Sequence, residues 1–214
     1  VKPALRDFLR RGAKFWVADG GDGTLHHVLN EALEVLEEEE FAPLEGKLPT
    51  AVPTNGGTID FVAHNAGVRG KAEGILGELR RWVEQGQEPS MTEVPTLLVE
   101  GQRMTAEGPR PFRRLGFAMA AGGIGQRFFK LYYSDASPSA KTILKVLGRG
   151  ILSFLSTLTP LGRLELIPKS WGDYAGHLFK ATPARVVVDG KELPYGTYTA
   201  LHVSAIEINL GNVF

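Results

Sequence analysis

Three glycines within four positions separate a short apolar run from an amphipathic segment near the start of this 214-residue chain. The apolar run, residues 14–18, predicts a buried strand, and after the glycines apolar side chains recur at helical spacing. The alternation then repeats, because residues 47–52 predict a second strand and residues 60–66 and 71–85 predict helices. Residues 1–87 are therefore predicted to form an α/β domain, a parallel sheet with flanking helices.

The pattern changes after Gly86, where several short segments are separated by turn residues, among them Gly101, Pro109 and Pro111. Strands are predicted at residues 92–100, 103–107, 115–121, 185–189 and 197–204. One long apolar segment, residues 139–158, predicts a helix inside this part. The sequence thus predicts a second domain over residues 88–214, a mainly antiparallel β-sandwich with a helical insertion.

Charge and composition narrow the class of function. Lysine plus arginine and aspartate plus glutamate both number 24, so the net charge of zero indicates no nucleic-acid partner. The chain has no cysteine, which excludes disulfides and cysteine-ligated zinc. No apolar run reaches the ~18 residues of a membrane-spanning helix. We therefore expect a cytoplasmic protein whose membrane contact, if any, is peripheral; the oligomeric state stays open.

The glycine turn, Gly20-Gly21-Asp22-Gly23-Thr24, has the composition of a phosphate-binding loop. Glycine lets a ligand approach the backbone closely, and the following helix presents unpaired N–H groups. Thr24 is placed to cap that helix or to donate to a phosphate oxygen. Asp22 would repel phosphate, so it suits a metal, a ribose or a substrate hydroxyl. A tight turn with a capping aspartate is the alternative, but the five-residue string between a strand and a helix favours a nucleotide site.

This string, continued by Leu25, Val28 and Asn30, resembles the signature of the diacylglycerol kinase catalytic domain, to which sphingosine kinases and bacterial lipid kinases are similar. The resemblance implies an enzyme that uses ATP and Mg²⁺ to move the γ-phosphoryl group to a lipid hydroxyl. Catalysis of this kind depends mainly on positioning and charge neutralisation. The resemblance places the whole turn against the nucleotide, with Asp22 as the catalytic candidate.

A second loop of the same family is matched by residues 53–63. Its Gly-Thr and Asp-Phe pairs are present, whereas Ile59 stands where the family has asparagine. In the first helix His27 stands in place of a glutamate. The resemblance implies that this loop also binds the nucleotide, through Gly56, Gly57 and Thr58.

Asp189 is a second catalytic candidate. The family's general base is thought to be the aspartate of a Leu-Asp-Gly-Glu motif, and Val188-Asp189-Gly190-Lys191 is similar except for its lysine. A type I′ hairpin with Asp-Gly at its tip explains this segment without any chemistry. We favour the hairpin interpretation.

The predicted helix over residues 139–158 combines apolar residues with Lys141, Lys145 and Arg149. This pattern suits an interfacial membrane helix or the wall of a lipid tunnel. It suits equally a core helix with a solvated basic side. A lipid substrate is the partner that the resemblance implies.

Two other functions stay open. NAD kinases and phosphofructokinases share a similar Gly-Gly-Asp-Gly turn, and the β-rich second half fits NAD kinase. The residues His27 and Ile59, together with the missing base motif, fit a lipid- or nucleotide-binding relative without catalysis.

Overall fold

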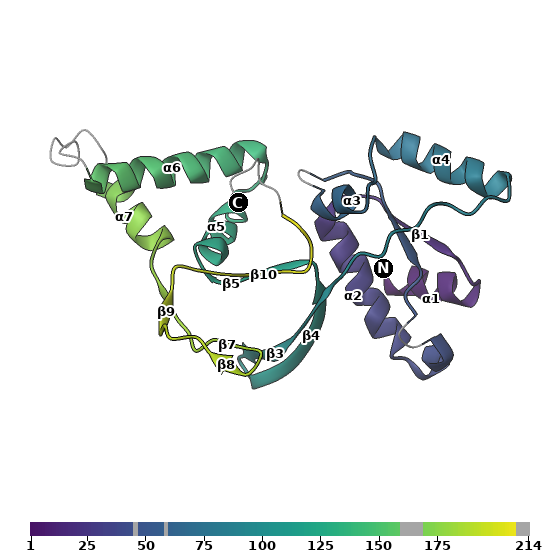
Figure 1. Cartoon of the computed structure of the whole chain (residues 1–214), viewed down its shortest axis with the longest axis horizontal. Coiled ribbons are helices and arrows are strands. Elements are labelled where there is room, and N and C mark those ends of the chain that lie inside the picture. The colour runs from purple at the N-terminus through teal and green to yellow at the C-terminus, as the bar shows by residue number, and fades with distance from the viewer. Residues whose placement is uncertain (45–46, 58–59, 159–168, 209–214) are drawn as a thin grey trace. The chain divides into compact units, whose positions relative to one another are not determined.

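The computed structural model describes residues 1–44, 47–57, 60–158 and 169–208, and it shows a mixed α/β protein (Figure 1). The chain divides into two compact units. Unit 1 comprises Val1–Ala118 and the segment that begins at Ser204, and unit 2 comprises Met119–Val203. The composition of the chain changes near residue 88, but the first unit continues to Ala118 because a β-hairpin beyond that point packs on a helix of unit 1.

A parallel strand pair is the centre of unit 1. Strand β1 (Phe15–Ala18) pairs with β2 (Thr50–Pro53), with Trp16 opposite Ala51. The surrounding helices are α1 (Lys2–Arg10), α2 (Asp22–Leu36), the 3₁₀ helix η1 (Glu39–Leu44), α3 (Phe61–Asn65) and α4 (Ala72–Glu84). The predicted parallel strands with flanking helices are therefore confirmed for this part of the chain.

The core of unit 1 lies between β1 and α2. Alternate side chains of a strand point to the same face, and Trp16 and Ala18 of β1 are both buried. One cluster of buried side chains joins α1, β1, α2 and η1 and contains Leu5, Trp16, Ala32, Val35, Leu36 and Phe41. A second cluster, at the start of α2, contains Ala18, Leu25, Val62 and Phe117. The second cluster fixes α3 close to the first turn of α2.

Ion pairs at one-turn spacing join α1 to the end of α2 and to η1. Lys2 pairs with Glu34 at 2.6 Å, and Arg6 and Arg10 make the equivalent contacts to Glu38 and Glu40. Hydrogen bonds from Lys2 and from Arg114 lower the pKa of Glu34 below its usual range. These pairs explain why so acidic a segment is tolerated at the carboxyl end of α2.

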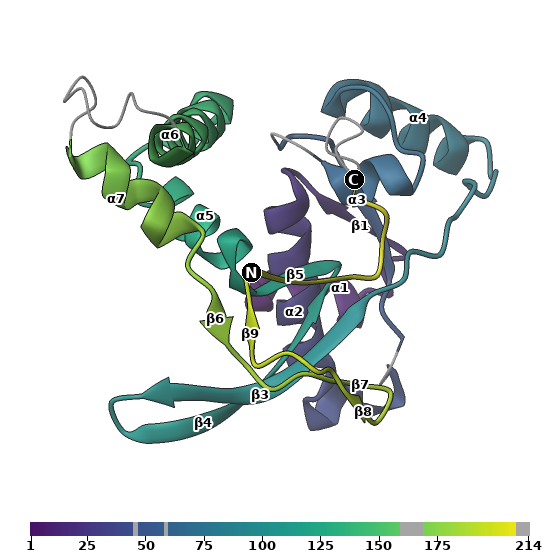
Figure 2. The same cartoon turned by 60° about the vertical axis from the view of Figure 1, so that its left-hand side comes forward.

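A long antiparallel hairpin completes unit 1. Strand β3 (Leu97–Thr105) pairs with β4 (Gly108–Gly116) along its whole length, as Figure 2 shows. Pro109 and Pro111, which the sequence pattern places between strands, instead lie within β4. Each strand has a single partner in the described chain, and proline is tolerated where a strand's N–H faces solvent. The strands predicted at 92–100 and 103–107 are one strand, β3, because Gly101 pairs with Phe112 and Gln102 with Pro111 without an interruption.

The strands of unit 2 form small two-stranded sheets. Strand β5 (Ala118–Gly123) pairs with β10 (Ala200–Ser204), β6 (Thr182–Pro183) with β9 (Thr197–Tyr198), and β7 (Val187–Val188) with β8 (Lys191–Glu192). The described residues do not form the predicted β-sandwich. A sandwich requires two sheets whose facing sides are buried, whereas the side chains of Val187 and Val188 are about half exposed.

Three helices accompany these strands in the described part of unit 2: α5 (Ile124–Tyr132), α6 (Ala140–Leu158) and α7 (Lys169–Leu178). Helix α6 confirms the helix predicted over residues 139–158, whereas α5 and α7 were not predicted. Within the described residues, every helix falls short of the length and hydropathy that crossing a membrane requires.

Candidate functional site

The two loops expected to bind a nucleotide leave the same edge of the β1–β2 pair. The first loop follows β1 and covers residues 19–24, which include the first turn of α2, and the second follows β2 and is described at residues 54–57 and 60. Because the strands are parallel, both loops start at carboxyl ends, where open α/β sheets bind their ligands. The structure thus brings together the two motifs that lie apart in the sequence.

Hydrogen bonds join the two loops directly. The hydroxyl of Thr54, a fully buried residue, donates to Asp19 Oδ1 at 2.8 Å and accepts from the Gly20 backbone N–H at 3.1 Å. The backbone N–H of Gly56 donates to the Gly20 carbonyl at 3.1 Å. The loops therefore form one hydrogen-bonded unit.

Packing accounts for most of the glycines at this edge. A Cβ on Gly21 would lie 2.5 Å from the Cα of Gly57, and one on Gly57 would lie 2.6 Å from the Cα of Gly21. A Cβ on Gly20 would lie 2.2 Å from the Thr24 hydroxyl, and one on Gly56 would lie 3.0 Å from the Cα of Gly20. Gly21, Gly56 and Gly57 are therefore needed for the close approach of the two loops, and Gly20 is needed for the packing of Thr24 within the first loop, whether or not a ligand binds.

Gly23 is different, because packing gives no reason for a glycine there. It is an exposed residue in the first turn of α2, and a Cβ added to it would meet no atom of the described residues within 4 Å. Glycine costs up to ~1 kcal/mol relative to alanine in a helix. Thr24 next to it is also exposed. Gly23 and Thr24 thus present open backbone and a hydroxyl at the positive end of α2.

Asp22 caps a helix of the second loop. Its carboxylate accepts the backbone N–H of Phe61 at 2.8 Å and that of Val62 at 3.0 Å, which are the first two residues of α3. The N-cap residue of α3, Asp60, makes no cap bond of its own, since its carboxylate accepts the N–H of Gly57 at 3.0 Å. The sequence predicted Asp22 to face a ligand, but it did not foresee this bond between the two loops.

Carboxylates are frequent at this edge, yet they form no metal site by themselves. Across the described residues, no three His, Asp or Glu side chains are placed to hold a metal ion. Mg²⁺ is commonly bound by one or two carboxylates together with substrate phosphates and water. Asp19 is exposed at the end of β1 and accepts a bond from Thr54. The residues present therefore fit a magnesium ion that arrives with a phosphate group, with Asp19 as the accessible carboxylate.

Sequence reasoning overlooked Asp19, Thr54 and Asp60, all of which build the loops. The signal for Asp19 was its position directly after a predicted strand, because residues at the carboxyl ends of parallel strands converge. Asn30, part of the resemblance, is a structural residue: its buried side-chain amide bonds both the N–H and the carbonyl of Leu115, each at 2.9 Å. Thr58, predicted to bind nucleotide, lies outside the described residues.

Asp189 belongs to unit 2 and lies at the tip of the β7–β8 hairpin. Asp189 has a φ of 50° and Gly190 a φ of 76°. Two consecutive positive φ values in a two-residue loop define a type I′ turn. The predicted hairpin is confirmed, and it accounts for the Asp-Gly pair without any chemistry; a catalytic role for Asp189 stays a prediction.

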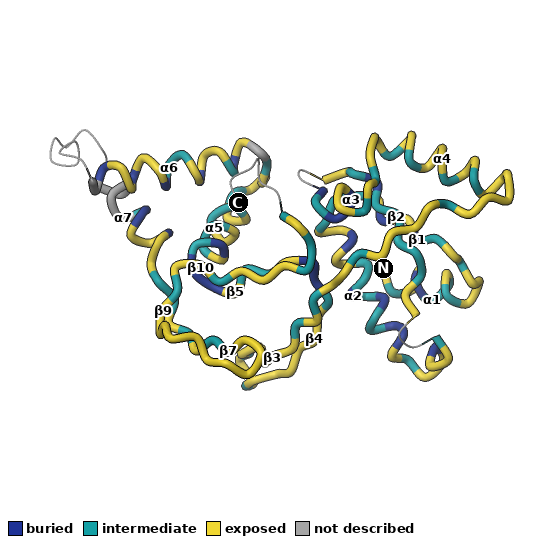
Figure 3. Tube along the Cα trace, in the orientation of Figure 1, coloured by how far each residue is buried: buried dark blue, intermediate teal, exposed yellow. Residues whose placement is uncertain are grey.

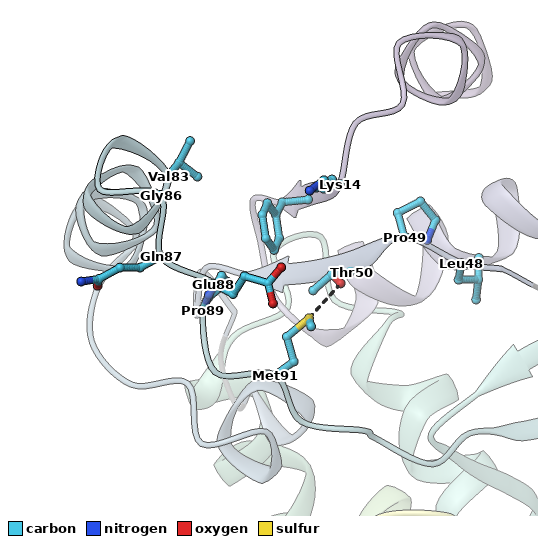
Figure 4. Close-up of a pocket in the computed structure, with 11 residues that line it drawn as sticks. Lys14, Leu48, Pro49, Thr50, Val83, Gly86, Gln87, Glu88, Pro89 and Met91 are labelled. Atoms are coloured by element: carbon cyan, nitrogen blue, oxygen red, sulfur yellow. Dashed lines mark hydrogen bonds between the residues drawn. The ribbon is translucent and has the colours of Figure 1, made fainter.

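A cavity of about 660 Å³ lies at the opposite edge of β1 and β2, where the strands begin (Figure 4). Its lining includes Lys14, Thr50 and Met91, and the Thr50 hydroxyl donates to the Met91 sulfur at 3.4 Å. None of the predicted site residues lines it. Since ligands of open α/β sheets bind at carboxyl ends, the glycine loops are the better candidate.

Comparison with known proteins identifies no relative, because no protein-family model, no curated protein and no solved structure matches this chain. A functional conclusion must therefore come from the geometry of the loops and from the residues that compose them.

Proposed function

We propose that the paired glycine loops bind ATP and that the protein transfers the γ-phosphoryl group to a lipid hydroxyl. One observation carries the proposal: the loops after β1 and β2 form a single hydrogen-bonded unit at the carboxyl ends of parallel strands, with Gly23 and Thr24 exposed. A glycine without a packing reason at the start of a helix is where a phosphate would approach the backbone.

Each residue of the loops has a distinct role in this proposal. The backbone N–H groups of Asp22 and Gly23 and the Thr24 hydroxyl donate to phosphate oxygens, whereas the N–H of Thr24 already donates to the Gly21 carbonyl at 3.0 Å. Gly21, Gly56 and Gly57 let the two loops approach closely enough to present one surface to the nucleotide, and Gly20 leaves room for the Thr24 side chain. A magnesium ion brought by the nucleotide would neutralise phosphate charge, with Asp19 as its protein ligand.

Asp22 positions the second loop by capping α3, and this is how we expect it to support catalysis. Each carboxylate oxygen has more than one acceptor site. Asp22 therefore keeps the capacity to accept a further bond from the acceptor hydroxyl while it holds Phe61 and Val62. The lipid acceptor itself follows from the resemblance of the loops to lipid kinases, and residues 88–214 would bind it in this cytoplasmic protein.

ATP binding by a matched pair of glycine variants tests the proposal. Gly23→Ala is expected to weaken ATP binding in calorimetry by about tenfold or more, the equivalent of about 1.4 kcal/mol. It should leave stability unchanged or raise it by up to ~1 kcal/mol. Gly74→Ala is the control, since Gly74 is also an exposed glycine in the first turn of a helix with no described atom near its Cβ position. Equal ATP affinity in wild type and Gly23→Ala would contradict the proposal.

The acceptor is identified by product analysis with radiolabelled ATP. A labelled lipid from a lipid mixture supports the kinase proposed above. A labelled NAD product identifies the NAD kinase alternative. ATP binding without transfer to either acceptor identifies a nucleotide-binding relative without catalysis.

A further inference from the structure

Helix α6 turns small and polar side chains inward and large apolar side chains outward. The buried positions are Thr142, Val146, Gly150, Ser153 and Ser156. The outer stripe, as we name it, consists of Leu144, Leu147, Ile151 and Leu152, whose exposed fractions are 71%, 44%, 57% and 51%. Figure 3 shows exposed residues recurring along this helix. A helix on a globular protein normally places its apolar side toward the core.

Ser153 and Gly150, on the buried side of α6, make described contacts with α7. Helices α5 and α7 pack against α6. The Ser153 hydroxyl accepts the backbone N–H of Ala175 in α7 at 2.9 Å, and a Cβ on Gly150 would lie 2.9 Å from the Leu178 side chain. The close crossing with α7 requires small residues on this side, so the apolar residues of α6 are left on the surface of the described chain.

All charged residues of α6 are basic. Between residues 140 and 158 the helix contains Lys141, Lys145 and Arg149 and no acidic residue. Lys141 and Lys145 are exposed, and the Arg149 guanidinium lies 4.5 Å from the ring centre of Tyr174. At 100° per residue, Lys141 and Lys145 lie next to Leu144 and Leu152 on the helix surface. The apolar stripe is therefore bordered by cations.

We propose that the outer stripe of α6 docks on an anionic lipid bilayer. The helix lies in the interface, with the stripe among the acyl chains and Lys141 and Lys145 among the headgroups. Contiguous exposed apolar side chains mark an interaction surface. Flanking cations of one sign match an anionic surface, and the helix is too polar to span a membrane. This surface is distinct from the glycine loops and does not depend on ATP binding.

Co-sedimentation of the full chain with vesicles tests the docking surface. We expect binding to vesicles of phosphatidylcholine with phosphatidylserine and weaker binding to phosphatidylcholine alone. Ile151→Glu should lower binding to the mixed vesicles by about tenfold or more, because it replaces an apolar side chain that would be buried in lipid. Val188→Glu is the matched control, since Val188 is 52% exposed but lies in the β7–β8 hairpin. This control should bind as the wild type does.

Charge variants test the proposed contact of Lys141 and Lys145 with the anionic headgroups. Lys141→Gln combined with Lys145→Gln should reduce binding to the mixed vesicles and its dependence on salt, because interactions between exposed charges are screened by ions. Lys191→Gln, an exposed lysine of β8, should change neither.

Three outcomes would overturn the proposal. One is a wild type that binds neither kind of vesicle, and another is an Ile151→Glu variant that keeps wild-type circular dichroism and wild-type vesicle binding. The third is a wild-type oligomer that Ile151→Glu dissociates in light scattering without any effect on vesicle binding, which would make the stripe a contact between copies of this chain. ATP binding is measured on the same variants and should stay unchanged, so failure of this proposal is distinct from failure of the nucleotide site.

Discussion

Replacing Asp22 tests the bond between the two loops most directly. Asp22→Ala removes a carboxylate that accepts two backbone N–H groups, at 2.8 and 3.0 Å, at the start of α3. Replacing a capping residue by alanine costs about 1 kcal/mol, and a hydrogen bond to a charged group contributes about 1.5–3 kcal/mol. Asp22 is only half-buried, so we take about 1 kcal/mol for each bond. The expected loss in the free energy of unfolding is then about 2 kcal/mol.

Urea unfolding followed by circular dichroism measures this loss. The change in the free energy of unfolding is calculated from the shift of the urea midpoint, provided that the m-value is the same in both proteins. Asp22→Asn keeps one acceptor oxygen and should lose about half as much. Asp19→Ala is the control, because Asp19 is exposed and accepts a single described bond, from Thr54. Because the buried Thr54 hydroxyl would lose its acceptor, the loss should be about 1 kcal/mol, about half of that expected for Asp22→Ala.

Activity is measured on the same variants. Asp22→Ala should abolish ATP-dependent lipid phosphorylation, because α3 loses its cap and the proposed acceptor for the lipid hydroxyl is removed. Stability of Asp22→Ala within about 0.5 kcal/mol of wild type would refute the capping argument. Full lipid phosphorylation by this variant would refute the assignment of the loops as the site.

Two further predictions concern the frame of unit 1. Asn30→Ala should cost about 2 kcal/mol in urea unfolding, because it removes both hydrogen bonds to the backbone of Leu115 in a buried place; an unchanged midpoint would contradict this. Glu34 has a lowered pKa in the folded protein, first because of its hydrogen bond from Lys2 and then because of that from Arg114. Its contribution is therefore present above the unfolded pKa of about 4.3 and is lost as the pH falls through the lower folded pKa. In Glu34→Gln, the free energy of unfolding should therefore fall slightly less than in the wild type as the pH drops below about 4.3. The difference should be small, because ion pairs near the surface contribute little. Equal pH profiles of the urea midpoint in the two proteins would contradict the pairing of Glu34 with Lys2 and Arg114.

The candidate site was predictable in part. The glycine turn and the second loop were identified because each is a local pattern, glycines directly after a strand and before a helix. That both loops serve one nucleotide site was expected only through a family resemblance. The packing of Gly21 on Gly57 and the capping of α3 by Asp22 depend on the pairing of β2 with β1. This pairing joins segments that are far apart in the sequence, so local patterns do not contain the information. For the same reason the sequence did not distinguish Gly23, which has no packing reason to be a glycine, from the neighbouring glycines at which a Cβ atom would clash.

The sequence by itself determined the features that arise from neighbouring residues: the strand–turn–helix units of unit 1, the helix α6 and the type I′ turn at Asp189 and Gly190. Tertiary structure decided the features that depend on pairing between distant segments. Prolines 109 and 111 stand inside β4 because that strand has one described partner. The apolar side of α6 faces outward because the crossing with α7 requires small residues. Helical periodicity shows that a helix has two different sides, but only the packing partner determines which side is buried.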